Sequence, residues 1–523
     1  MISFAIPAFN EPHFTDHMAN KQCRVINITE VTQDAFFAYN RLFEENGLSQ
    51  KECRQNGQHY FAAYAGENVG VFLNFFASLG ELNIVIEENC RYFSYQDTCA
   101  SKRVPAQITQ VHLEDYGMSY VIRLSDGRLI VIDGGWKFEP DIDNLLRCLQ
   151  EAACGEKPVI AAWILTHPHA DHFHCCVGFL NRYADQVVIE KFFLHFPEAD
   201  DFEHYPALQN DDFRVKDTAA KIKIPELFNE IEKLGVPVYM PHTGQVYSIG
   251  DAVCEILATI DDTIHLSKDV NMTSLVFRME LADQVILWTA DAGCSYARLP
   301  EKYGTYLRAD ILQVPHHGFQ SGGGDAEIRA YDLIQPRVCF MPVPESEAYG
   351  AFCTYRKSTR YLMTSLGIDE LITGPIQRTI TLPYTPPAYA KQDLQNKLRN
   401  GLDDGGARTW VFTDLHTACE EDFVFTILNM AVVTANVCME LFFENSNQNV
   451  NGIQAKIPAK TFRRLCIVDA NDVNPDAVYF NWMTLATRGV PENVPFAVRF
   501  ISDTPVVISH KTHTPAYRSN LNR

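Results

Sequence analysis

Hydrophobic positions in the first hundred residues follow two different periods. In TQDAFFAYNRLFEENGL the apolar residues recur at helical spacing, which predicts a helix that ends at Asn46-Gly47. HYFAAYAGENVGVFLNFF and ELNIVIEE alternate around turn residues, as antiparallel strands do. We therefore expect a small N-terminal α+β domain over residues 1–104.

From about residue 105 the pattern changes to many short strands with helices between them. QITQVHL, MSYVIRL and RLIVIDGG are separated by the turn signals EDYG and SDG. NLLRCLQEAA and VGFLNRYA have helical spacing, and PVIAAWILTH between them is typical of a buried strand. Two groups of strands with interspersed helices predict an α/β domain over residues 105–385, with sheets between helical layers.

The remaining residues are expected to form a linker and a third domain. The polar stretch KQDLQNKLRNGLDDGGAR predicts a linker at residues 386–404. Beyond it, short strands such as DFVFTILNM and PFAVRFISD alternate with turn residues. This spacing predicts a C-terminal all-β sandwich over residues 405–523.

Composition narrows the class of protein. Of the 523 residues 46% are apolar, too many for one core, so several domains are expected. The net charge of −21 disfavours tight binding to long nucleic acid or an anionic membrane. No apolar window reaches the roughly 20 residues of a membrane helix, and the N-terminus lacks signal-peptide features. The 15 cysteines show no pairing rhythm, so we expect a cytoplasmic protein with reduced thiols.

The stretch ILTHPHADHFH concentrates metal-ligating residues after an apolar run. His167 and His169 alternate in extended chain and can bind one ion together. The chain then turns into a helix, whose first turn projects Asp171 and His172 toward a second ion. Imidazole with carboxylate suits Zn²⁺, and also Mn²⁺ or Fe. The alternative to a metal site is a polar loop that merely contains several histidines. His174 is expected to be exposed on the helix and not to be a ligand.

Three more motifs give the chain a resemblance to a known family. VIDGGW places Asp133 before two glycines, ILWTAD places Asp291 at a strand end, and ADILQVPHHG contains His316 and His317. With HxHxDH, these motifs resemble the metallo-β-lactamase fold superfamily, and most closely its ComEC-type branch, over roughly residues 105–385. The resemblance implies an αββα sandwich and a metal-dependent hydrolase.

The resemblance also implies roles for individual side chains. The implied ligands of two divalent ions, Zn²⁺ first, are His167, His169, Asp171, His172, Asp291, His316 and His317. Asp291 would bridge the ions, and either His316 or His317 would complete the second site while the other contacts substrate or donates a proton. Asp133 would orient ligands by hydrogen bonding. The candidate catalytic residues are Asp171, His317 and Asp133.

The sequence departs from the superfamily pattern at two places. Another histidine usually precedes the bridging aspartate, and the candidates here are His195, His204, His242 and His265. Of these, His265 follows the appropriate strand but lies well past its end. Branch members also carry a histidine where this chain has Ala351 after Tyr349-Gly350. The first metal site is therefore expected to lack one ligand.

The C-terminal segment resembles a second family. An opening Trp410, the strands ILN and FFE, the segment IPAK and a D-x-P-V-V strand are similar to the sensory-rhodopsin transducer family. That resemblance implies a β-sandwich that assembles into a homo-oligomer or binds a small ligand.

Together these features predict a hydrolase in which metal-bound hydroxide attacks a phosphoester or other small ester-type substrate. The acidic chain favours a small-molecule substrate over long nucleic acid. The alternative is a non-catalytic metal-binding sensor or scaffold that acts through its flanking domains.

Overall fold

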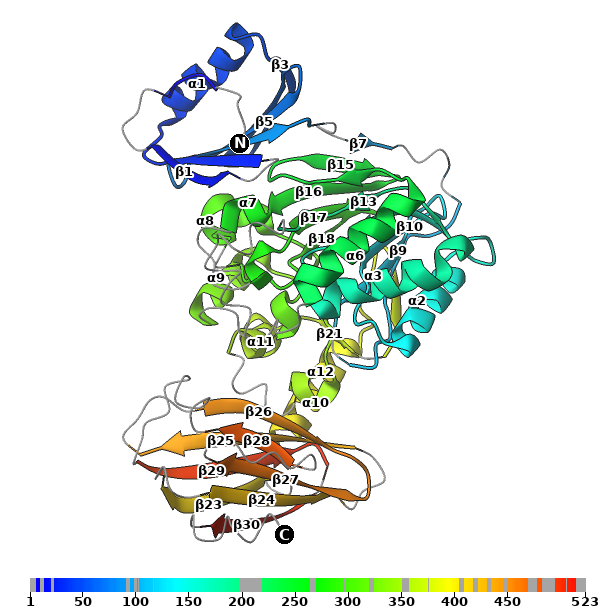
Figure 1. The fold of residues 1–523 in the computed structure, drawn as a ribbon, viewed down its shortest axis with the longest axis vertical. Helices are drawn as coiled ribbons and strands as arrows, with labels where there is room; N and C mark the ends of the chain where they lie inside the picture. Colours follow the sequence, from blue (N-terminus) through cyan, green and yellow to red (C-terminus); the bar gives the residue numbers. More distant parts are fainter. Residues whose placement is uncertain are drawn as a thin grey trace. The chain divides into compact units, whose positions relative to one another are not determined.

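The computed structural model divides into two compact units. The described residues are 6–9, 14–19, 23–90, 95–97, 101, 103–115, 117–197, 219–263, 270–294, 297–318, 324–349, 357–374, 376–403, 409–416, 422–429, 434–444, 450–468, 477–481, 494–504 and 506–513. The first unit comprises Met1–Pro344 with Arg356–Leu394, and the second comprises Glu345–Tyr355 with Gln395–Arg523. The first holds the N-terminal sheet and two central sheets, and the second holds the C-terminal strands (Figure 1).

An antiparallel six-stranded sheet and one helix form the N-terminal part of the first unit. The strand order is β1-β2-β6-β5-β4-β3. The strands are β1 (Phe14–Ala19), β2 (Cys23–Ile28), β3 (Ser49–Asn56), β4 (His59–Ala65), β5 (Val69–Phe76) and β6 (Glu81–Glu88). Helix α1 (Gln33–Glu45) begins after Thr32, whose hydroxyl accepts a hydrogen bond from the Ala35 amide at 3.2 Å. This cap satisfies one of the N–H groups that a helix start leaves unpaired.

Both faces of this N-terminal sheet are covered. Tyr60, Ala62 and Tyr64 of β4 belong to the buried cluster that includes α1. The alternate residues Phe61 and Ala63 belong instead to a cluster shared with the central sheets and helices. Successive strand residues point to opposite faces, so the near-continuous apolar runs in β4 and β5 reflect a sheet buried on both sides.

The first central sheet carries the strands that precede the histidine motif. Its order is β14-β13-β11-β10-β9-β8-β22, and β12 also pairs with β11. Its strands are β8 (Gln107–Gln110), β9 (Ser119–Arg123), β10 (Leu129–Asp133), β11 (Val159–Ile164), β12 (Val188–Ile189), β13 (Phe192–Phe193), β14 (Val238–Tyr239) and β22 (Arg378–Thr381). Strands β10, β11, β13 and β14 run parallel, so their carboxyl ends share one edge.

The second central sheet has the order β21-β20-β19-β18-β17-β16-β15-β7. Its strands are β7 (Tyr95–Gln96), β15 (Val246–Ile249), β16 (Ala252–Ala258), β17 (Val276–Leu281), β18 (Gln284–Trp288), β19 (Ile311–Gln313), β20 (Val338–Met341) and β21 (Glu370–Thr373). Strands β18 to β21 are parallel. The described residues of this sheet and the first thus form two eight-stranded layers.

The two central sheets pack face to face between helices. Ile130 and Ile132 of β10 join a cluster with Phe277 and Trp288 of the second sheet, while Val131 faces the helices. The outer face of the first sheet is covered by α2 (Glu139–Ala152), α3 (Ala170–Tyr183) and α6 (Ala219–Leu234). Helices α8 (Leu299–Tyr303), α9 (Gly324–Ile334) and α11 (Lys357–Tyr361) lie on the other side of the sandwich (Figure 1). The predicted αββα architecture is thereby confirmed.

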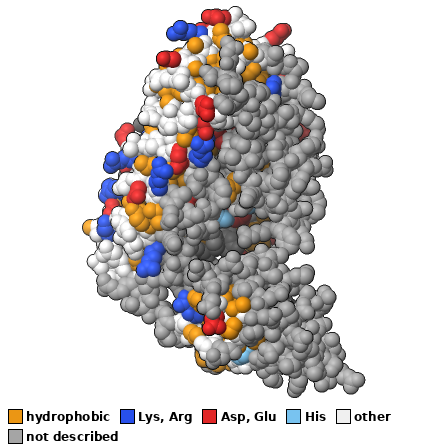
Figure 2. Space-filling view, turned by 90° about the vertical axis from the view of Figure 1, so that its left-hand side faces the viewer, with side chains coloured by type: hydrophobic (Ala, Val, Ile, Leu, Met, Phe, Trp, Pro, Cys, Tyr) orange, Lys and Arg blue, Asp and Glu red, His pale blue; other side chains and the backbone are white. Residues whose placement is uncertain are grey.

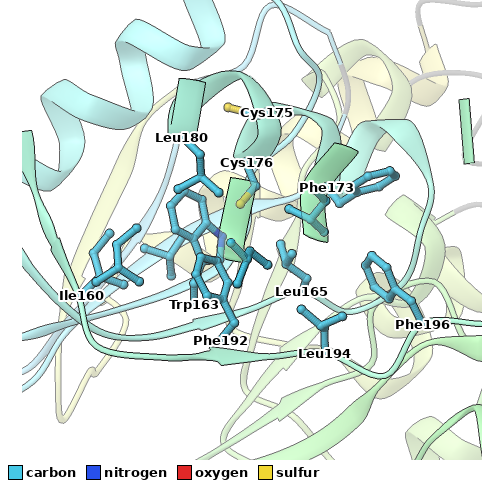
Figure 3. Close-up of a cluster of buried hydrophobic side chains, with 14 of the residues drawn as sticks. Ile160, Trp163, Leu165, Phe173, Cys175, Cys176, Leu180, Phe192, Leu194 and Phe196 are labelled. Atoms are coloured by element: carbon cyan, nitrogen blue, oxygen red, sulfur yellow. The ribbon is translucent and has the colours of Figure 1, made fainter. Parts of the chain in front are cut away.

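The helical layer over β11 is tightly packed. Figure 3 shows Trp163 at the centre of a cluster that includes Phe173, Cys176 and Leu180 of α3. Cys175 and Cys176 are fully buried there as small apolar side chains. Short helical segments complete the first unit: η1 (Ala184–Gln186), α7 (Ile260–Thr263), η3 (Val270–Thr273), η4 (Gly304–Leu307), η5 (Pro315–Gly318) and η7 (Leu362–Leu366).

The segment expected as a linker at residues 386–404 contains helix α12 (Ala390–Asp403). Ala390, Leu394 and Leu398 recur every four residues and are all buried, so one narrow apolar stripe holds this polar helix in place. The polar segment thus contains a helix, and the division between the two compact units falls within it, after Leu394.

The second unit contains the predicted C-terminal sandwich. One sheet has the order β23-β29-β25-β26 and the other β28-β27-β24-β30. The elements are α10 (Glu345–Tyr349), β23 (Thr409–His416), β24 (Asp422–Asn429), β25 (Ala435–Phe443), β26 (Val450–Ile457), β27 (Thr461–Val468), β28 (Ala477–Asn481), β29 (Pro495–Ser502) and β30 (Val506–His513). Inward residues of both sheets, including Phe425 and Phe500, form one buried cluster.

The described part of one face carries mixed charge. Figure 2 shows Lys and Arg side chains interspersed with Asp and Glu over the described part of one face. A search of the described helices finds none with the length and apolar character needed to cross a membrane.

Candidate metal centre

The candidate centre is built from loops that follow parallel strands of both central sheets. Asp133 ends β10, and His167 and His169 follow β11 in the first sheet. Asp291 follows β18 in the second sheet, and the His316-His317 pair follows β19. The loops after the carboxyl ends of parallel strands are a common place for functional residues in α/β folds.

Local backbone geometry fixes the positions of the HxHxDH residues relative to helix α3. His169 is the N-cap of α3, with extended dihedral angles of φ −86° and ψ 149°. The helix then begins, so Asp171 and His172 lie in its first turn. The Gly135 amide donates a hydrogen bond to the His172 carbonyl at 3.2 Å. A Cβ on Gly134 would come within 3.3 Å of the Cys176 amide nitrogen, so the two glycines let this loop lie against α3.

Asp133 is a buried acceptor at the base of the centre. Its Oδ1 accepts the Thr166 amide, and its Oδ2 accepts the Thr166 hydroxyl, both at 2.7 Å. Nδ1 of His172 donates to the same Oδ2 at 2.7 Å. The Thr166 hydroxyl has then used its proton, so it accepts from Nδ1 of His167 at 3.2 Å. In both rings Nδ1 is thus engaged away from the centre, and Nε2 is the nitrogen available to a metal ion.

The ligating atoms form two groups that share one carboxylate. The first group is His167, His169 and Asp291, and the second is Asp171, His172, Asp291 and His317. Within each group the donor atoms lie within 4.8 Å of one another. His317 Nε2 lies 3.2 Å from Asp171 Oδ2 and 3.4 Å from Asp291 Oδ2. His167 Nε2 lies 3.9 Å from the same oxygen of Asp291.

The geometry separates His316 from His317. The His317 side chain is 2% exposed and faces both aspartates, whereas the His316 side chain is 19% exposed. His316 Nε2 lies 3.3 Å from Nδ2 of Asn271 and 3.9 Å from Asp291 Oδ2. Both histidines have left-handed φ angles of 50° and 52°, as do Asp133 and Ala290. Non-glycine residues in this conformation are strained, and such residues cluster at functional sites.

The residues present fit a pair of metal ions. His167 Nε2 is buried and makes no hydrogen bond within the part of the chain that the structure describes. A buried imidazole nitrogen without a partner is costly, and a metal ion would satisfy it. Nitrogen and carboxylate donors around a shared aspartate suit Zn²⁺, Mn²⁺ or Fe.

The electrostatics of the centre point the same way. Burial and the neighbouring imidazoles lower the pKa of His167, so it stays in the neutral form that binds metal. Burial alone would lower the pKa of His317, but the Asp291 and Asp171 carboxylates overcome this and raise it to about 9. The pKa of Asp291 is lowered, since the charges of His172 and His317 outweigh the effect of burial. The centre thus holds carboxylate charge that cations stabilise.

The candidates for a further histidine lie elsewhere or outside the described residues. His195 and His242 fall in neither of the groups that contain Asp291. His204 and His265 lie outside the described residues. His174, expected to be exposed, is only 9% exposed. That expectation is wrong because α3 is covered on this side too, where the His174 ring packs 4.6 Å from the ring of Phe173.

Two residues at the centre were not singled out from the sequence. Thr166 links Asp133 to His167 through its hydroxyl, and Asn271 lies against His316. Thr166 directly precedes the HxHxDH motif, which is the one local signal for it. Asn271 lies in the segment NMTSLV, upstream of Asp291, and its contact with His316 depends on the fold.

Comparison with known proteins agrees with the fold. Residues 113–261 match the family model of the metallo-beta-lactamase superfamily. The two facing sheets between helices agree with the fold of that superfamily, as the sequence predicted. A search of curated proteins finds no match.

Two solved structures are similar to parts of the chain. The Anabaena sensory rhodopsin transducer is 22% identical, over 20% of this chain and 96% of that chain, with a TM-score of 0.15. CmlA, a diiron beta-hydroxylase from Streptomyces venezuelae, is 12% identical with a TM-score of 0.32. The second match covers 54% of this chain and 55% of the hydroxylase, about half of its length.

Proposed function

We propose that the central domain is a dinuclear metal-dependent hydrolase that acts on a small phosphoester or related ester. The observation that carries this proposal is the pair of ligand groups that share Asp291. Two adjacent divalent ions make bound water more acidic and stabilise negative charge that develops on a reacting ester.

The chain's own residues then have separate tasks. Asp133 and Thr166 fix the ring orientations of His172 and His167 by the hydrogen bonds described above. Asp171 and His317 complete the second group of ligands, and Asp291 belongs to both groups. His316 is more exposed than His317, and in this proposal it would contact a substrate oxygen or deliver a proton to the leaving group.

The surroundings favour a small substrate. His169 and Asp171 are partly exposed, whereas His167 and His172 are fully buried, so substrate would approach from the side of the first pair. The net charge of −21 and the mixed charge in Figure 2 offer no support for a long polyanion. A compact ester with one reacting phosphorus or carbonyl group fits these constraints best.

The test combines metal content with turnover. Protein purified without added metal should contain close to two equivalents of Zn, Mn or Fe bound by the dinuclear centre, and should hydrolyse bis-p-nitrophenyl phosphate. His169→Ala should abolish turnover, and His112→Ala, a histidine outside both groups, should not. Bound metal without turnover on phosphoester, thioester and lactone substrates would contradict the proposal and favour the sensor or scaffold alternative.

We also infer that the C-terminal sandwich joins two copies of the chain. Leu428 of β24 pairs with Phe462 of β27 on one side and with Val507 of β30 on the other. All three are exposed, at 37%, 57% and 43%. Directly opposed residues share a face of a sheet, so they form an apolar row across its outer surface. Exposed apolar patches of this kind are typical of association surfaces.

Sedimentation of the full chain tests this inference. Wild-type protein should sediment as an oligomer, and Phe462→Glu should shift it to monomer. Val411→Glu changes an exposed residue of the other sheet, 58% exposed, and should leave the oligomer intact. A monomeric wild-type chain at micromolar concentration would overturn the inference.

A further inference from the structure

A second cluster of metal-ligating side chains lies where the N-terminal sheet packs on the central domain. Cys23 of β2, His195 after β13 and His242 after β14 have donor atoms within 4.8 Å of one another. Cys23 and His242 are 0% exposed, and His195 is 5% exposed. Buried thiolate and imidazole in this combination are typical zinc ligands.

In both histidines a hydrogen bond from Nδ1 fixes the orientation of the ring. His242 donates from Nδ1 to Asp261 Oδ2 at 2.6 Å, and His195 donates from Nδ1 to the Pro241 carbonyl at 2.9 Å. Each ring therefore has Nδ1 engaged and Nε2 as the nitrogen available to a metal ion. Metal-binding histidines characteristically donate their other N–H to a carboxylate or a backbone carbonyl, and here one does each.

Two carboxylates flank the same space. Glu87 is the cross-strand partner of Cys23 in the β2–β6 pair, so both side chains leave the sheet on one face. Its Oε2 lies 3.2 Å from His242 Nε2. On the other side, Oδ1 of the buried Asp261 makes no hydrogen bond among the described residues and lies 3.7 Å from His195 Nε2. A buried carboxylate oxygen in that position is stabilised by a nearby cation.

We propose that Cys23, His195 and His242 bind a structural Zn²⁺ ion that fastens strand β2 to the loops after β13 and β14. Glu87 and Asp261 supply negative charge beside the ion. The ligands come from segments that are far apart in the chain, so the ion joins the N-terminal sheet to the central domain. The burial of all three ligands leaves no access for a substrate, which makes the site structural and not catalytic.

Cobalt substitution of the full chain tests the proposal. The metal-depleted protein, titrated with Co²⁺ alone, should develop a near-ultraviolet thiolate-to-cobalt charge-transfer band. The groups around Asp291 contain only nitrogen and oxygen donors, so that band does not arise from them. Cys23→Ser should remove the band. Cys254→Ser, which changes a buried cysteine of the sandwich core, should retain it.

X-ray absorption at the zinc edge gives a measurement that needs no variant. The zinc-loaded wild-type chain should show a sulfur neighbour at about 2.3 Å, together with nitrogen or oxygen neighbours near 2.0 Å. A spectrum with nitrogen and oxygen alone would overturn the proposal. A sulfur signal or cobalt band that persists in folded Cys23→Ser would overturn it as well. Neither readout depends on hydrolase activity, so the two proposals fail independently.

Discussion

Oδ2 of Asp133 lies 2.7 Å from Nδ1 of His172, and both groups are fully buried. The same oxygen also accepts a hydrogen bond from the Thr166 hydroxyl, which contacts Nδ1 of His167. A single carboxylate therefore fixes the ring of His172 directly and the ring of His167 through a relay, the Thr166 hydroxyl. A carboxylate in this position makes the attached imidazole a stronger ligand.

Asp133→Asn should therefore weaken metal binding without removing any direct ligand. We expect a loss of affinity of about 10- to 100-fold, the usual effect of removing such a hydrogen-bond partner. Competition with a chromophoric chelator measures it. Thr166→Val should weaken binding at the group containing His167, whereas Thr166→Ser keeps the hydroxyl and should match wild type. Equal affinities for Thr166→Val and Thr166→Ser would rule out the relay.

His316 and His317 provide a matched pair at adjacent positions. His317→Asn should lower the metal content of the centre by close to one equivalent, because this ring faces both Asp171 and Asp291. His316→Asn should keep both ions and lower kcat, because this ring is more exposed and lies against Asn271. Metal analysis alongside steady-state kinetics separates the two effects. The reverse outcome would exchange the proposed roles.

Gly318, next to the histidine pair, has φ +77°, and a Cβ there would come within 2.4 Å of Met341 Cε. Gly155 has φ +89° with no atom within 4 Å of such a Cβ. Gly155→Ala should thus cost only the left-handed strain, about 1–2 kcal/mol. Gly318→Ala should lower the free energy of unfolding further and weaken metal binding through its neighbour His317. Denaturant unfolding of both variants measures the difference, and equal losses would contradict it.

His59 should make the first unit sensitive to mild acid. Burial lowers its pKa to about 4, while an unfolded histidine titrates near pH 6.5. The unfolded chain therefore takes up a proton first as the pH falls. The contribution of neutral His59 to stability is complete above about pH 6.5 and is lost toward pH 4, by up to roughly 3 kcal/mol.

Denaturant unfolding followed between pH 7 and 4.5 should show this loss. His59→Asn should be less stable at pH 7 but should have a shallower dependence on pH. The variant loses stability at pH 7 because the His59 ring packs with its centroid 4.7 Å from that of Phe76 and hydrogen-bonds to Asn74. The pH dependence becomes shallower because asparagine carries no group that titrates in this range. Identical slopes for the two proteins would assign the acid sensitivity to other groups.

Local patterns in the sequence predicted the sandwich and the ligands within HxHxDH. These features depend on residues close together in the chain, such as the strand β11 and the start of α3. The His316 and His317 alternatives stayed open, because both residues have left-handed φ angles and only the folded chain shows which ring is buried against the aspartates. No residue pattern near position 316 distinguishes them.

Other features depend on contacts between distant segments, which a single sequence does not display. Cys23 meets His242 only because β2 pairs with β6 and that sheet packs on the central domain. Helix α12 escaped prediction for a different reason. Among the side chains of α12 whose burial is described, the buried ones form a stripe so narrow that the surrounding polar residues dominate the pattern.

The packing of Phe61 and Phe72 in the same cluster as Val131 and Trp163 has a genetic consequence. A gene fragment that begins after residue 104 would encode a sandwich with a bare apolar flank, missing the strand that carries Cys23. The first hundred residues are thus not an exchangeable module. Recombination at that boundary would expose a hydrophobic surface on both products.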